Sequence, residues 1–187
     1  MKKLLLSTAL LSLTLVNAAT PKEIKEEAKT AIVKLKTTLQ TQLKSNLKKG
    51  GPEQAAIFCS NQAVNITRTV NSSFAHNTKI RRISLKNRNS ENSPKSDERV
   101  VLEQMQKDLQ NGKKIAPLIV KQVFEDTYKV YKPIFINKGV CLTCHGDVQH
   151  RDEKAYKIIS ENYPNDKATG YKMNDLRGAF VVTIVKK

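Results

Sequence analysis

The segment AFVVTIV, Ala179–Val185, sets the class of the fold, because five of its seven residues are β-branched. Such side chains favour strands, where they pack well on a pleated surface. Three earlier segments, 79–85, 115–120 and 128–136, carry apolar residues in alternating or short continuous runs and are also predicted strands. The sequence therefore predicts a sheet whose final strand is this segment.

A long helix is predicted ahead of these strands. It begins at Thr20, which forms a capping box with Glu23, and it ends at Gly50 and Gly51. Between these ends apolar residues recur at spacings of three and four, which places them on one helix face: Ile24, Ala28, Ile32, Leu35, Leu39, Leu43 and Leu47.

Further helices are predicted at 52–70, 96–111 and 152–162. Cys59 falls on the apolar face of the first of these and is expected to point inward. Ser96 is predicted to cap the second. The order of helices and strands along the chain indicates an α+β fold with an antiparallel sheet.

The N-terminus has the three-part layout of a secretory signal peptide. Lys2 and Lys3 precede an apolar run at 4–16, and small residues follow up to Ala18. This run is short for a membrane span of about 20 residues, so an uncleaved anchor is the lesser interpretation. We expect residues 1–18 to be removed on export and the mature protein to be periplasmic.

The chain is strongly basic, with 33 Lys and Arg residues against 17 Asp and Glu residues and a net charge of +16. No nucleic-acid partner is expected, because the lysines are dispersed and the chain has no Trp and few other aromatic residues for base stacking. We interpret the charge as a solvated surface. A basic surface of this kind could also make a weak contact with an anionic membrane surface or bind a carboxylate-bearing cofactor.

The segment CLTCH, Cys141–His145, holds two of the three cysteines and one of the three histidines in the chain. The spacing C-x-x-C-H is the signature of covalent haem attachment, in which Cys141 and Cys144 would form thioethers and His145 would bind the iron as proximal ligand. Three alternatives stay open: a zinc site, a redox-active cysteine pair and a structural disulfide. Zinc would need a fourth ligand, and the redox pair lacks its usual βαβ context. Haem c, with its iron, is therefore the favoured cofactor.

The opposite face of the iron has several candidate ligands. Met105 lies on an apolar helix face and is better explained as a core residue. His150 is close in sequence to the proximal histidine, which makes a path to the other haem face awkward. Cys59 points inward, but a free cysteine is also commonly a small buried apolar residue. The remaining candidates are His76, Met173 and an empty position.

Four segments of the chain, taken together, resemble a family of exported c-type haem domains with a PAS-like fold. The family is known from cyanobacterial proteins with histidine/cysteine haem ligation and from sensory regions of bacterial signalling receptors. The segments stand in the expected order: AAIFCSNQA (55–63), RRISLKNRNSEN (81–92), GVCLTCHGD (139–147) and YPNDKATGYKMNDLRGAF (163–180). The resemblance implies a haem domain at 52–187, preceded by the long N-terminal helix at 19–51 and the signal peptide at 1–18.

The resemblance also implies a ligand set for this chain. Cys59 takes the position of the distal thiolate, opposite His145. Haem propionates require cations, and the candidates for these contacts are Arg82, Arg88 and Arg177, with Arg81 and Lys86 as further ones.

A thiolate ligand favours Fe(III) over Fe(II), so the reduction potential should be low. The predicted function is redox or gas sensing through a partner, either a redox protein or a signalling receptor. A small periplasmic electron-transfer cytochrome is the alternative. An enzyme such as a peroxidase is least favoured, because a bound Cys59 would close the distal site and no paired acid/base residues are apparent.

Overall fold

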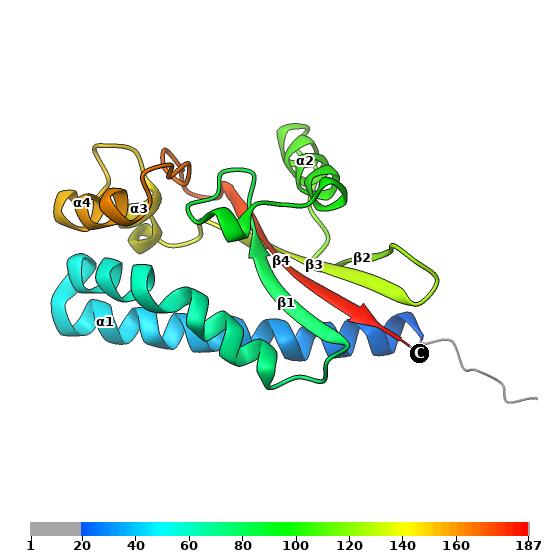
Figure 1. Ribbon diagram of the computed structural model, residues 1–187. Coiled ribbons are helices and arrows are strands. Elements are labelled where there is room, and N and C mark those ends of the chain that lie inside the picture. Colours follow the sequence, from blue (N-terminus) through cyan, green and yellow to red (C-terminus); the bar gives the residue numbers. More distant parts are fainter. Residues whose placement is uncertain (1–19, 187) are drawn as a thin grey trace, which may run out of the picture.

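The computed structural model describes residues 20–186 and has an α+β architecture (Figure 1). The predicted signal peptide, residues 1–18, lies outside the described residues. The predicted fold class is confirmed: the structure has a PAS-like antiparallel sheet flanked by helices, with a long N-terminal helix. The elements are α1 (Pro21–Ser72), β1 (Thr78–Ile83), the short 3-10 helix η1 (Ser90–Asn92), α2 (Ser96–Gln110), β2 (Ile119–Gln122), β3 (Thr127–Phe135), α3 (Gly139–His145), α4 (Glu153–Asn162) and β4 (Leu176–Val185).

Helix α1 is a hairpin of two helical arms, which run side by side in opposite directions in Figure 1. The predicted capping box is present, since Glu23 N donates to Thr20 Oγ1 at 3.3 Å and Thr20 N donates to the Glu23 carboxylate at 2.8 Å. The predicted break is also present: Gly50 and Gly51 have non-helical backbone angles, and Gly51 has φ +65°, a region that favours glycine. The two arms therefore span residues 21–49 and 52–72.

The four strands form an antiparallel sheet in the order β1-β4-β3-β2. Strand β4 lies between β1 and β3, and Val182 stands opposite Ile80 on one side and Val130 on the other. Successive side chains of a strand point to opposite faces. Val182 therefore packs against α1, and Val181 packs in the cluster that contains Leu102 of α2.

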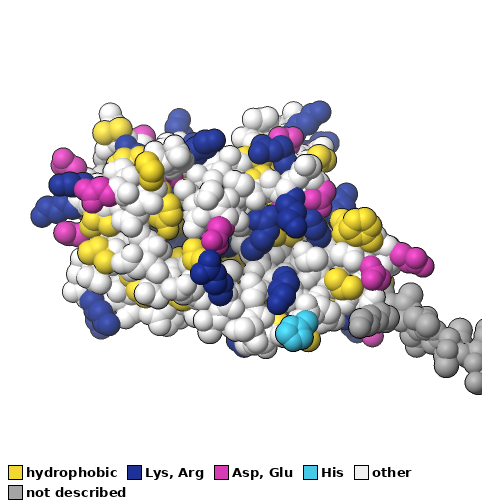
Figure 2. Space-filling view, in the orientation of Figure 1, with side chains coloured by type: hydrophobic (Ala, Val, Ile, Leu, Met, Phe, Trp, Pro, Cys, Tyr) yellow, Lys and Arg dark blue, Asp and Glu magenta, His cyan; other side chains and the backbone are white. Residues whose placement is uncertain are grey.

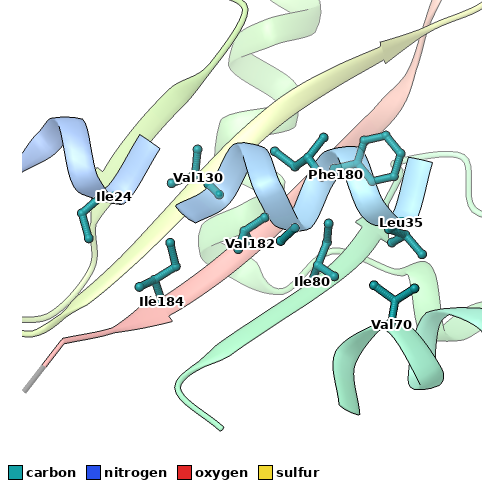
Figure 3. Close-up of a cluster of buried hydrophobic side chains, with 11 residues drawn as sticks. Ile24, Leu35, Val70, Ile80, Val130, Phe180, Val182 and Ile184 are labelled. Carbon is teal, nitrogen blue, oxygen red and sulfur yellow. The ribbon is translucent and has the colours of Figure 1, made fainter. Parts of the chain in front are cut away.

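The core is accordingly split between the two faces of the sheet. The larger cluster joins the first arm of α1 to the sheet, and Figure 3 shows its side chains converging between the helix and the strands. Its buried members are Ile24, Ala28, Ala31, Ile32, Leu35, Val70, Ile80, Val130, Phe180, Val182 and Ile184. The first arm is thus part of the same packed body as the sheet.

Several local predictions differ from the structure. Strand β4 begins at Leu176 rather than at residue 179, and β1 ends at Ile83 rather than at residue 85. Strand β2 begins at Ile119 rather than at residue 115, after Pro117, which lacks the N–H that a ladder requires. The N-cap of α2 is Lys95 rather than Ser96, and the Glu98 carboxylate accepts the Lys95 N–H at 2.8 Å. The helix α3 was not predicted.

The surface of the described residues fits the expected dispersal of charge. Figure 2 shows Lys and Arg side chains in several separate groups on one face, with Asp and Glu side chains among them. Within residues 20–186 no helix is both long enough and apolar enough to cross a membrane.

We predict that Gly178→Ala lowers the free energy of unfolding by about 2 kcal/mol, because a Cβ at this position would lie 2.2 Å from the Ile83 carbonyl oxygen. The backbone at Gly178 also has φ +154°. Urea unfolding would measure the loss. Gly139→Ala is the matched control, since an added Cβ there meets nothing within 4 Å; equal stabilities of the two variants would contradict the prediction.

Candidate functional site: a cavity lined by cysteine, histidine and arginine

A cavity of about 680 Å³ lies between the hairpin α1, the helix α3 and the adjoining end of the sheet. This volume is within the range of small-molecule and cofactor sites, roughly 300–1,000 Å³. Both arms of α1 contribute apolar walls, and the sheet contributes more. These wall residues are Leu39, Leu43, Leu47, Ala55, Ala56, Phe58, Ala63, Val64, Ile134, Phe135, Ile136 and Phe180.

The helix α3 brings the CLTCH side chains into this cavity. Cys141, Cys144 and His145 are at positions i, i+3 and i+4, which lie on one helix face, and all three line the cavity. The helix is held by two small apolar clusters. Cys144 packs with Ala56 of α1 and with α4, and Cys141 packs beside Tyr171.

The imidazole of His145 is oriented by a backbone carbonyl. Nδ1 lies 2.8 Å from the Ala168 oxygen, which can only accept, so Nδ1 carries the proton and Nε2 keeps its lone pair. Tyr171 packs edge-on to the ring, with centroids 6.2 Å apart. Burial lowers the pKa of His145 well below its ordinary value, and the charges of Arg177 and Arg88 add to this effect. The ring is therefore a neutral donor with one nitrogen available.

Cys59 projects into the same cavity from the second arm of α1. Burial raises the pKa of its thiol, the neighbouring Cys144 raises it further, and Arg82 and Arg88 oppose the rise. The structure thus brings together in one cavity all three cysteines and His145, which come from two separate parts of the chain.

None of the other candidate ligands lines this cavity among the described residues. Met105 is buried in the core beneath α2, as expected. His150 is exposed, with Nδ1 2.6 Å from the Asp147 carboxylate. His76 and Met173 are exposed as well.

The three favoured arginines, Arg82, Arg88 and Arg177, also line the cavity, but they differ in their partners. Within residues 20–186 no hydrogen bond or ion pair engages the Arg82 guanidinium. Arg177 Nη1 donates to Ser84 Oγ at 2.7 Å, while its buried Nε has no partner among the described atoms. Arg88 pairs with Asp166 at 3.1 Å. Burial lowers the pKa of Arg82 and that of Arg177.

The two further cations are directed elsewhere. Arg81 forms an ion pair with Glu98, and Lys86 donates to the Thr169 carbonyl. Neither lines the cavity. For Arg81 this follows from strand geometry, because Arg81 and Arg82 are neighbours on β1 and so point to opposite faces of the sheet.

Several residues that shape the site were not singled out from the sequence. The side chain of Asp166 is buried and pairs with Arg88. The Ala168 carbonyl and Tyr171 orient His145. Gly146 is required by close packing, since a Cβ there would lie 2.7 Å from the Leu142 oxygen. The segment YPNDKATGYKMNDLRGAF contains three of these four residues and was the available signal.

The zinc alternative finds no support in this geometry. Within the described part of the chain, no three His, Cys, Asp or Glu side chains gather closely enough to hold a metal ion directly. The cysteines and the histidine instead surround a larger apolar space.

Comparison with known proteins identifies the family. Residues 17–185 match the family model described as Tll0287-like. The chain belongs to this family. A solved structure, the crystal structure of the cyanobacterial haem protein Tll0287, superposes with a TM-score of 0.65 at 22% sequence identity, covering 90% of this chain and 98% of that one. No curated protein matches the chain. The family relationship predicted from the four segments is thus confirmed, and the structural match supports the PAS-like fold.

We predict that Arg82→Met raises the free energy of unfolding by about 1 kcal/mol, because the partly buried Arg82 charge has no partner among the described residues and an unpaired charge is costly to desolvate. Urea unfolding would measure the gain. Arg68→Met, at an exposed ion pair with Glu91, is the control and should change stability by less than about 0.5 kcal/mol. A loss of stability in Arg82→Met would contradict the prediction.

Proposed function

We propose that this chain is an exported c-type haem protein with His/Cys axial ligation and a low reduction potential. The observation that carries the proposal is the convergence of Cys59, Cys141, Cys144 and His145 on one apolar cavity. Export is supported by the predicted signal peptide at 1–18, which leads to the periplasm. The related cyanobacterial protein of known structure is a haem protein, which agrees with this proposal.

The residues of the cavity fit a haem. The haem macrocycle is flat and apolar, and the leucine, isoleucine and phenylalanine side chains of the cavity walls offer it an apolar surface. Its two propionates need cations. The Arg82 guanidinium lines the cavity and has no hydrogen bond or ion pair with the described residues, and Arg177 Nε also has no partner among them. Arg88 lines the cavity too, but its Nε and Nη2 are already bonded to protein oxygens. Arg82 and Arg177 are therefore the stronger candidates.

The side chains have distinct roles in this proposal. Cys141 and Cys144 supply thioether sulfurs from one face of α3. His145 supplies Nε2 as proximal ligand, with its tautomer fixed by Ala168. Cys59 supplies a thiolate from the hairpin as distal ligand. A bound haem would provide a one-electron centre, and the thiolate would lower its potential.

The function that we favour for this centre is redox or gas sensing. Cys59 lies on α1 and His145 lies on α3, so a haem held by both residues would link these two elements. The Cys59 Sγ is the atom that would exchange a proton at this link, which suits a site that responds to redox state or to a small gas. A redox protein or a signalling receptor would be the partner.

A periplasmic electron-transfer cytochrome is the second candidate. Val140 lines the cavity and is 46% exposed, so the cavity reaches the surface beside the cysteine motif. A partner could approach a bound cofactor there. Fast electron self-exchange would favour this function, whereas CO binding restricted to the reduced protein would favour sensing.

We predict that the protein, expressed with a cytochrome c maturation system, carries haem that stays on the chain in denaturing electrophoresis and adds one haem to its mass. The reason is that thioether bonds survive denaturation. Replacing both Cys141 and Cys144 with Ser should release the pigment, whereas Cys59→Ser should retain it. A colourless wild-type protein with the mass of the polypeptide alone would exclude the proposed function.

We also predict that Cys59→Ser changes the EPR and absorption spectra of the oxidised protein away from a thiolate-ligated pattern and raises the midpoint potential, because the anionic donor is lost. His150→Gln is the control, since His150 lies on the surface. Unchanged spectra in Cys59→Ser would assign the distal position to another group.

A further inference from the structure

The loop after α4 carries a buried ion pair that reaches the cysteine motif. Asp166 in this loop pairs with Arg88, which follows β1, with nitrogen and oxygen 3.1 Å apart. Their side chains are only 2% and 15% exposed. The free energy lost in desolvating such a buried pair offsets much of the Coulomb attraction between its charges. Its main effect is therefore to fix the positions of the groups that it bonds.

The guanidinium of Arg88 has two further acceptors, both beside His145. Nη2 donates to the Cys144 carbonyl at 2.6 Å and to the Ala168 carbonyl at 3.4 Å. Ala168 O is also the acceptor for His145 Nδ1. One side chain therefore fixes the end of α3 relative to the carbonyl that orients the imidazole.

Backbone hydrogen bonds also join the same loop to the C-terminal end of α3. Tyr171 N donates to the His145 carbonyl at 3.0 Å, and Gly170 N donates to the Gly146 carbonyl at 2.9 Å. Asp166 Oδ1 accepts the Ala168 N–H at 2.7 Å, which fixes the peptide that precedes the Ala168 Cα. Asp166 thus holds both Arg88 and the residue whose carbonyl bonds the histidine.

We propose that Arg88 and Asp166 are positioning residues for His145, acting through the Ala168 carbonyl. This inference rests on the proposed haem site. Groups that orient a ligating histidine strongly influence the metal centre although they do not touch it. Without the pair, the Ala168 carbonyl would turn away, and the imidazole would bind the iron less firmly as a ligand.

The main test is Asp166→Asn in the haem-loaded protein. Asn keeps an oxygen for Ala168 N but loses the charge that holds Arg88. Glu98→Gln is the matched control, because the Glu98 side chain is also 2% exposed and forms ion pairs with Lys129 and Arg81 outside the cavity. Haem content, midpoint potential, the spectrum of the oxidised protein and urea stability would be measured on both variants.

The expected result for Asp166→Asn is full haem attachment, a rise in midpoint potential and a new high-spin component in the oxidised spectrum. Glu98→Gln should lose a comparable amount of stability while keeping the wild-type potential and spectrum. Wild-type potential and spectrum in Asp166→Asn would overturn the proposal, and so would an equal shift in the control.

Arg88→Lys provides a second test if Asp166→Asn fails to accumulate. Lysine keeps the charge but lacks the planar fork that reaches the Asp166, Cys144 and Ala168 oxygens together. A shift in the same direction as that expected for Asp166→Asn supports the proposal, and a wild-type potential overturns it. A wild-type protein without attached haem would instead refute the proposed function, so the two failures are distinguishable.

Discussion

The pairing of β4 with both β1 and β3 is the interaction on which the rest of the structure depends. The alternation of this strand supplies Phe180, Val182 and Ile184 to the layer beneath α1, and Ala179 and Val181 to the layer beneath α2. The same strand begins at the cavity, where Arg177 and Phe180 form part of the wall. The register of β4 against its neighbours therefore sets both the core packing and the cavity wall. A shift of this register by one residue would move every β4 side chain to the opposite face of the sheet.

The arginine charges in the cavity are close enough to repel one another. Arg82, Arg88 and Arg177 share its walls, and of these only Arg88 has a carboxylate partner among the described residues. Their mutual influence is visible in Arg177, whose pKa is lowered by burial and, less strongly, by the charges of Arg88 and Arg82. A ligand with two carboxylates would relieve this repulsion, so Arg82 and Arg177, which have no carboxylate partner among the described residues, would be suited to hold the proposed cofactor.

Much of the fold could be predicted because its signals are local. The β-branched segment at 179–185 predicted the central strand, and Gly50 and Gly51 predicted the break in α1 because few other residues adopt such backbone angles. The helix α3 was missed because seven residues carry too little periodicity, and its helical form depends on packing against α1 and α4. The predicted start of β2 was too early, because Pro117 belongs to an apolar run but has no N–H to donate to a strand ladder.

Some residues of the candidate site could likewise be predicted from local sequence, and others could not. The cysteines and His145 were predicted from rare residue types at a diagnostic spacing, and Cys59 from its helix face and a family resemblance. The Arg88–Asp166 pair could not be predicted, since its members are 78 positions apart in the sequence. Nothing in the composition indicates that the Ala168 carbonyl, a group shared by every amino acid, accepts from the histidine. Backbone groups acquire such roles only from the path of the chain.

The position of β4 in the chain has a consequence for the order of assembly. This strand follows every other described element, yet it occupies the interior of the sheet. Because α1 contacts both β1 and β3, the hairpin holds these strands near one another, and β4 completes the sheet between them. The cysteine motif at 141–145 precedes β4 in the chain. In the proposed haem protein, the thiols would therefore be accessible for attachment before the final strand completes the sheet.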